Sequence, residues 1–78
     1  MPKKIRELKA LLRQAGFTCD SRRGKGSHSV WEHPLLSYPV NLAGNDGDDA
    51  KRYQEKDVRN ALRDLEQRQQ EEDNGSAL

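Results

Sequence analysis

The sequence predicts a single α+β domain in the order helix, strand, strand, strand, helix. Two observations lead to this prediction. Apolar residues recur at helical spacing near both ends of the chain, and the middle holds short alternating segments separated by glycine and proline. A chain of 78 residues is long enough for one small core. Because each helix has one apolar side, we expect both to pack on one face of a three-stranded antiparallel sheet.

The first helix is expected over residues 3–15. Its apolar residues recur at spacings of three and four, which places them on one side of a helix. They are Ile5, Leu8, Leu11, Leu12 and Ala15. Basic residues stand between them, and Gly16 follows at the usual place of a left-handed C-cap. This helix should therefore have one face in the core and a basic outer face.

Three short strands should follow the first helix. Residues 17–23 and 27–33 are expected to form two of them, joined by a turn at residues 24–26, "GKG". Pro34 ends the second strand, because proline has no N–H to donate to a neighbouring strand. Residues 40–43 alternate apolar and polar side chains and predict the third strand.

The clearest helical pattern lies in residues 53–70, where four apolar residues share one side of a helix. They are Val58, Ala61, Leu62 and Leu65. The acidic residues 44–49 lack the spaced ligands and closing glutamate of a calcium loop, so we expect a turn and a negative lead-in to this helix. Residues 1–70 should form the domain. Residues 71–78 should form a flexible acidic tail, because they have little to bury.

The composition excludes several classes of site. Cys19 is the one cysteine, so no internal disulfide can form, which suits a reducing compartment. His28 and His33 have no second cysteine nearby and give no metal-ligand pattern, so neither a metal nor a cofactor is expected. No signal-peptide core and no apolar run of about 20 residues is present. We therefore expect a cytoplasmic protein without membrane contact.

The net charge of +1 conceals an asymmetry between the two halves of the chain. Residues 1–31 carry eight Lys and Arg against two acidic residues, a balance of +6. Residues 32–78 carry six against eleven, a balance of −5. A basic half offers a positive patch to a polyanion such as nucleic acid. The alternative is that these charges only solvate a small domain.

The segment "GKGSHSVWEHP" at residues 24–34 can serve two purposes. It can be a tight hairpin turn, or it can present an imidazole and cations to a phosphodiester. RNA carries its own nucleophile, the 2′-hydroxyl, so a ribonuclease needs proton-transfer groups and cations for the developing negative charge. Histidine changes its charge near neutral pH, so His28 can transfer those protons.

The residues around His28 supply groups that bind phosphate. Cationic side chains attract the anion, glycine lets a backbone amide approach it closely, and hydroxyls donate hydrogen bonds. These residues are Arg22, Arg23, Lys25, Gly26, Ser27 and Ser29. The alternative is that the glycines only form a turn and that His28 is an ordinary surface or packed residue.

Two further residues of this segment allow more than one interpretation. Trp31 can belong to the core or its rim, or it can be a platform on which a base stacks. Its neighbour Val30 is also apolar, so the pattern does not show which sheet face holds the indole. His33 precedes Pro34 and is expected to end the strand.

The order of four motifs resembles the HicA family, the toxins of HicA/HicB toxin–antitoxin systems. The motifs are "LLRQAGF", "GKGSH", "VWEHP" and "EKDVRNALRDL", and the resemblance covers about residues 3–67. Its most specific part is Gly-Ser-His at residues 26–28, followed by an aromatic residue and His33-Pro34.

The resemblance implies a fold like that of double-stranded-RNA-binding domains and a ribonuclease that cleaves mRNA without a metal. It places the family's catalytic histidine at His28. It also implies a HicB-like antitoxin partner. The chain differs from many members in having Ala43 and Asn45 near a position where they carry a histidine, and in its acidic lead-in to the second helix. The alternative function is a non-catalytic module of the same fold that binds double-stranded RNA or another protein.

Overall fold

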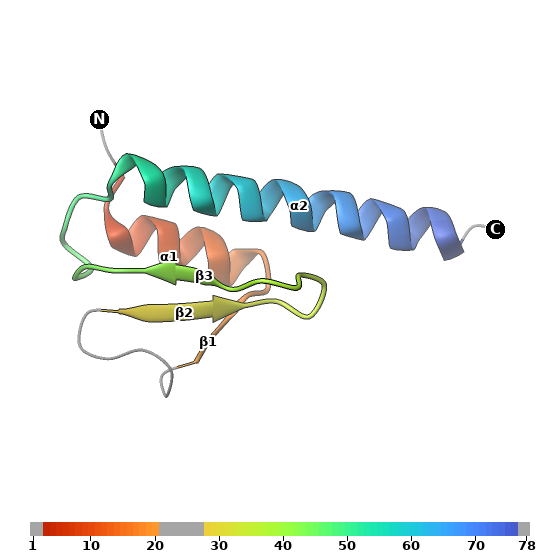
Figure 1. Cartoon of the computed structure of the whole chain (residues 1–78), viewed down its shortest axis with the longest axis horizontal. Coiled ribbons are helices and arrows are strands. Elements are labelled where there is room, and N and C mark those ends of the chain that lie inside the picture. The colour runs from red at the N-terminus through yellow and green to blue at the C-terminus, as the bar shows by residue number, and fades with distance from the viewer. Residues whose placement is uncertain (1–2, 21–27, 77–78) are drawn as a thin grey trace.

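The computed structural model describes residues 3–20 and 28–76, with side chains as far as Glu71. It shows the predicted order of elements (Figure 1). These are α1 (Ile5–Gln14), β1 (Thr18–Asp20), β2 (Ser29–Glu32), β3 (Val40–Leu42) and α2 (Arg52–Ser76). The predicted α+β fold class is therefore confirmed. The first two strands are shorter than expected within the described residues, and residues 21–27 lie outside them.

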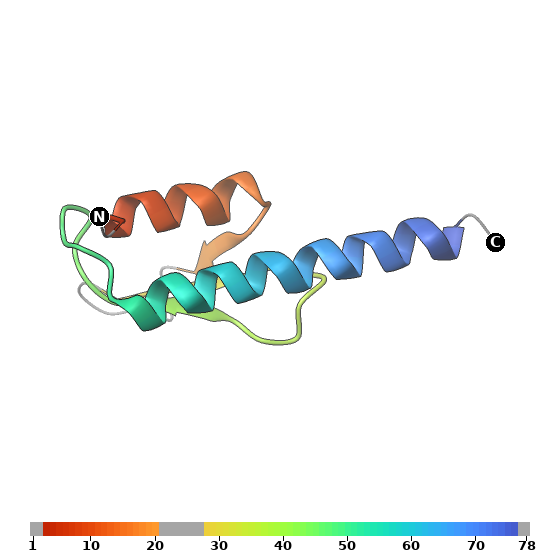
Figure 2. The same ribbon diagram turned by 90° about the horizontal axis from the view of Figure 1, so that it is seen from above.

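The three strands form one antiparallel sheet in the order β1-β2-β3. Both helices lie on the same side of this sheet, as Figures 1 and 2 show. Because β2 is central, β1 and β3 are edge strands, and one side of β3 faces α2 rather than another strand.

Trp31 lies at the centre of the core. Cys19, Trp31 and Val40 form one row across the sheet, and Trp31 is only 1% exposed. The indole N–H donates a 2.9 Å hydrogen bond to the Ser29 hydroxyl oxygen. The Arg13 guanidinium lies 5.2 Å from the indole centroid, within the range of a cation–π contact. The core interpretation of Trp31 is thus confirmed, and the stacking interpretation is wrong.

The acidic loop, residues 44–49, caps the N-terminus of α1. The first backbone N–H groups of a helix have no partner within the helix. Here the Ile5 N–H donates to the Asp48 carbonyl at 2.9 Å, and the Arg6 N–H donates to the Asp46 carbonyl at 3.2 Å. The loop was expected only to lead into the second helix. The structure shows that it also caps the first helix.

The same loop neutralises two lysines of the basic helix. Lys4 Nζ lies 2.5 Å from Asp49 Oδ1, and Lys9 Nζ lies 2.6 Å from Asp46 Oδ1. The hydrogen bond and charge of Lys9 hold the pKa of Asp46 below its ordinary value of 3.8. The positive outer face predicted for α1 is therefore partly cancelled within the molecule.

Helix α2 is longer than the sequence pattern predicted. It continues to Ser76, past the last core residue, Leu65, and projects beyond the sheet (Figure 2). The described side chains after Leu65, from Glu66 to Glu71, are all exposed. The flexibility of residues 71–78 stays a prediction.

Candidate functional site

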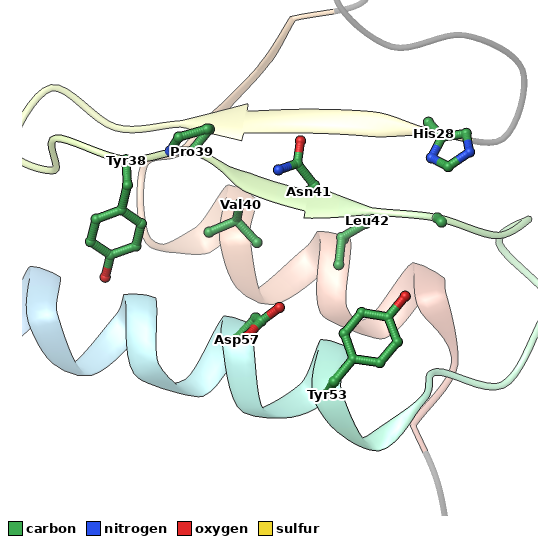
Figure 3. A pocket seen from close by; sticks show the side chains of 9 residues that line it. His28, Tyr38, Pro39, Val40, Asn41, Leu42, Tyr53 and Asp57 are labelled. Carbon is green, nitrogen blue, oxygen red and sulfur yellow. The ribbon is translucent and has the colours of Figure 1, made fainter.

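His28 stands immediately before β2 with an exposed side chain. It lines one end of an open groove of about 440 Å³ (Figure 3). Continuing the register beyond the Ser29–Leu42 pair sets His28 beside Ala43, which lines the same groove. The histidine singled out by the sequence is thus accessible from solvent.

The groove runs along the outer edge of β3, between that strand and the start of α2 (Figure 3). Asn41 is exposed, whereas the flanking Val40 and Leu42 are buried, as expected for alternating residues of a strand. From α2 come Tyr53 and Asp57, four residues apart and therefore on one side of the helix. The groove is therefore lined both by the His28 segment and by the second helix, which are far apart in the sequence.

Two tyrosines line this groove, and they are the exposed large hydrophobic residues of the described chain. Tyr53 is 56% exposed and Tyr38 is 40% exposed. The Tyr38 hydroxyl donates a hydrogen bond to Asp64 Oδ2, which ties the β2–β3 connection to α2. The Tyr53 hydroxyl has no hydrogen-bond partner among the residues that the structure describes. One ring is therefore fixed, and the other is available.

The environment of Tyr38 disfavours its anionic form. Partial burial, the hydrogen bond to Asp64 and the negative charge of that carboxylate raise the pKa of Tyr38 from 10.0 to about 12, against the opposing charge of Arg68. The phenol therefore stays protonated and keeps donating to Asp64 over the physiological pH range.

Gln54 fixes the position of α2 at the groove. Its side chain is 2% exposed and makes two hydrogen bonds, both of 2.8 Å. Gln54 Oε1 accepts from the Lys51 N–H at the start of the helix, and Nε2 donates to the Ala43 carbonyl just after β3. A buried amide without hydrogen-bond partners would be costly. The Gln54 amide finds its partners only when α2 packs beside β3, so its hydrogen bonds stabilise that packing. The hydrophobic pattern gave no signal for it.

Most of the predicted phosphate-binding residues lie outside the described part of the chain. They are Arg22, Arg23, Lys25, Gly26 and Ser27. Ser29 is described and half-buried, and its hydroxyl oxygen accepts from Trp31 on the helix-facing side of the sheet. Its contribution to phosphate binding stays a prediction.

Three cations at the start of α2 were missed by the sequence analysis, which counted this half as acidic. They are Lys51, Arg52 and Lys56. All three are exposed, and none has an ion pair among the described residues. Lys51 and Arg52 directly precede Tyr53, and Lys56 follows it three positions later in α2. A local count over residues 51–56, rather than over half the chain, would have revealed them.

His33 has a different role from His28. It is half-buried, and its Nδ1 accepts a 3.1 Å hydrogen bond from the Leu35 N–H. Its carbonyl accepts from the Leu36 N–H at 3.1 Å, which closes the turn after β2. The prediction that His33 ends the second strand agrees with β2 ending at Glu32.

In the part of the chain that the structure describes, no helix is long and apolar enough to cross a membrane. No three His, Cys, Asp or Glu side chains of the described residues are grouped so that they could hold a metal ion. Residues 5–67 match the family model described as the HicA toxin of bacterial toxin–antitoxin systems. Searches of the curated proteins and of the solved structures gave no match.

Proposed function

Because the chain belongs to the HicA family of bacterial toxin–antitoxin toxins, we propose that it is a ribonuclease that cleaves mRNA. His28 is the proton-transfer residue, and the reaction uses neither a metal ion nor a cofactor. The observation that supports this most directly is the exposure of the imidazole at the end of an open groove. A proton-transfer residue for a polymeric substrate has to be reachable in this way.

The reaction begins at the ribose 2′-hydroxyl. His28 takes its proton, the 2′-oxygen bonds to phosphorus, and the bond from phosphorus to the 5′-oxygen of the next nucleotide breaks. The departing oxygen takes a proton from the imidazolium or from water, leaving a 2′,3′-cyclic phosphate and a 5′-hydroxyl end. Residues on both sides of His28 in the sequence bind the phosphate and stabilise its added charge. They are Arg22, Arg23, Lys25, Gly26, Ser27 and Ser29.

The partner of this toxin is a HicB-like antitoxin, in keeping with a family defined by toxin–antitoxin pairs. Such a partner neutralises the toxin by covering His28 or by blocking RNA from the groove beside it. The toxin acts in the cytoplasm, where its mRNA substrate is found.

Expression of the wild-type chain and of His28→Ala in bacteria tests the proposal. The wild type should arrest growth and cleave mRNA, and His28→Ala should do neither at equal protein level. Gln69→Ala, a change at an exposed residue of α2 distant from His28 along the fold, serves as the control and should behave as wild type. If His28→Ala is as toxic as the wild type, the assignment fails. If neither chain cleaves RNA, a non-catalytic RNA-binding or protein-binding module becomes the better description.

A further inference from the structure

We infer that the groove between β3 and α2 holds one unpaired nucleotide of single-stranded RNA next to the scissile phosphate, with its base stacked on Tyr53. This inference rests on the proposed ribonuclease function and specifies the form of its substrate. The groove volume of about 440 Å³ lies within the range of about 300–1,000 Å³ typical of small-ligand sites. His28 lines the same groove, so a nucleotide there is adjacent to the reacting bond.

The exposed ring of Tyr53 is the first part of the argument. Tyrosine usually buries its apolar body, yet this ring is 56% exposed and no described side chain satisfies its hydroxyl. Single-stranded RNA is commonly bound by stacking its unpaired bases on such rings. Trp31, the other aromatic candidate from the sequence, is buried and cannot do this.

Polar groups line the groove from both of its walls, Asp57 from α2 near Tyr53 and Asn41 from the face of β3 that points away from the helices (Figure 3). Asn41 and Asp57 are exposed and line the groove, and their side chains have no hydrogen-bond partner among the described residues. The Asn41 amide can both donate to and accept from a base. The Asp57 carboxylate accepts from a base amino group or a ribose hydroxyl. These groups favour a nucleotide over an apolar ligand.

Cations near Tyr53 can bind the backbone of the strand whose base stacks on the ring. Lys4 and Lys9, which the sequence offered as part of a basic helical face, are paired with Asp49 and Asp46. Other cations, with no ion pair among the described residues, lie within three positions of Tyr53 along the chain; they do not line the groove, and they can bind phosphates of the strand outside it. They are Lys51, Arg52 and Lys56. A base held in a duplex cannot turn its face to a side chain in this groove.

Direct binding measurements test the inference. The His28→Ala chain, which should not cleave, is titrated with a short labelled single-stranded RNA and with the duplex of the same sequence. Adding Tyr53→Ala should weaken single-strand binding about 5- to 100-fold, the loss expected from one stacked base. Adding Tyr53→Phe, which keeps the ring, should restore binding to within a few-fold. Gln69→Ala is the matched surface control.

The outcomes separate this inference from the proposed function. Equal single-strand binding with and without Tyr53 overturns the inference, as does a preference for the duplex. If wild type and Tyr53→Ala then cleave RNA equally while His28→Ala does not, the ribonuclease proposal stands and only the subsite is wrong. If His28→Ala cleaves like wild type, the proposed function fails whatever Tyr53 does.

Discussion

The rings of His33 and Phe17 meet edge to face, with centroids 5.2 Å apart and planes inclined by 63°. Phe17 follows Gly16 at the end of α1, and His33 follows β2, so the contact fastens the first helix to the sheet. It brings the Gly16-Phe17 and His33-Pro34 motifs, which are separate in the sequence, into one packing contact. The proton-transfer residue that we propose is the other histidine, His28, which is exposed.

Gly16 should tolerate no side chain. Its φ of +95° disfavours any other residue, and an added Cβ would lie 3.3 Å from His33 Nε2. Gly16→Ala should therefore lower the free energy of unfolding by about 1–3 kcal/mol, measured by urea denaturation. Gly47→Ala is the control, because nothing lies within 4 Å of its Cβ position. A change there should stay within about 0.5 kcal/mol. Equal effects at the two sites would contradict this account of Gly16.

His33→Ala should reduce stability rather than chemistry. It removes the acceptor for the Leu35 N–H and the ring packed on Phe17, so we expect a loss of about 1–3 kcal/mol in the free energy of unfolding. The cleavage rate per folded molecule should change little. The exposed His28 should show the reverse pattern in the same two assays. A fully stable His33→Ala protein would show that the contact is unimportant.

The Lys9–Asp46 pair should contribute to acid sensitivity. The pKa of Asp46 is lowered on folding, so its contribution is complete above the ordinary value of 3.8 and is lost as the pH falls through the folded value below it. The stability difference between wild type and Asp46→Asn should therefore shrink as the pH is lowered from 7 through this range. In a Lys9→Gln background the difference should be smaller at all pH values. A difference independent of pH and of Lys9 would contradict the pairing.

Tyr38 should titrate at a higher pH than an ordinary tyrosine. In a Tyr53→Phe chain the tyrosinate absorbance reports Tyr38 alone, because the sequence has two tyrosines. Its midpoint should lie at about 12 and should fall when Asp64→Asn removes the carboxylate. Because the folded pKa is raised, the stabilising contribution of Tyr38 is complete below pH 10 and is lost as the pH rises towards 12. A midpoint near 10 would show that the contact with Asp64 does not form in solution.

The element order could be predicted from sequence because it depends on local periodicity. The spacing of Ile5, Leu8 and Leu12 specifies a helix face without knowledge of the fold. The face of Trp31 could not be predicted, since the adjacent Val30 is equally apolar and strand alternation is then ambiguous. The full length of α2 was missed because its polar second half has no apolar periodicity to read.

The candidate site could be predicted only where its residues are contiguous. His28 was found from its own segment, whereas Tyr53 reaches the same groove from a helix that begins at Arg52. The contact of the acidic loop with α1 joins Lys9 to Asp46, residues 37 positions apart. Such pairings depend on how the chain folds back on itself, which the hydrophobic pattern does not specify.

The cleavage rate of purified His28→Ala under single-turnover conditions tests the central claim most directly. Because His28 is exposed, the variant should keep the far-ultraviolet circular dichroism and melting temperature of the wild type. Its rate on a single-stranded RNA should fall by about 10²- to 10⁴-fold, the contribution expected of one proton-transfer group. Equal rates for a folded His28→Ala and the wild type would contradict the account.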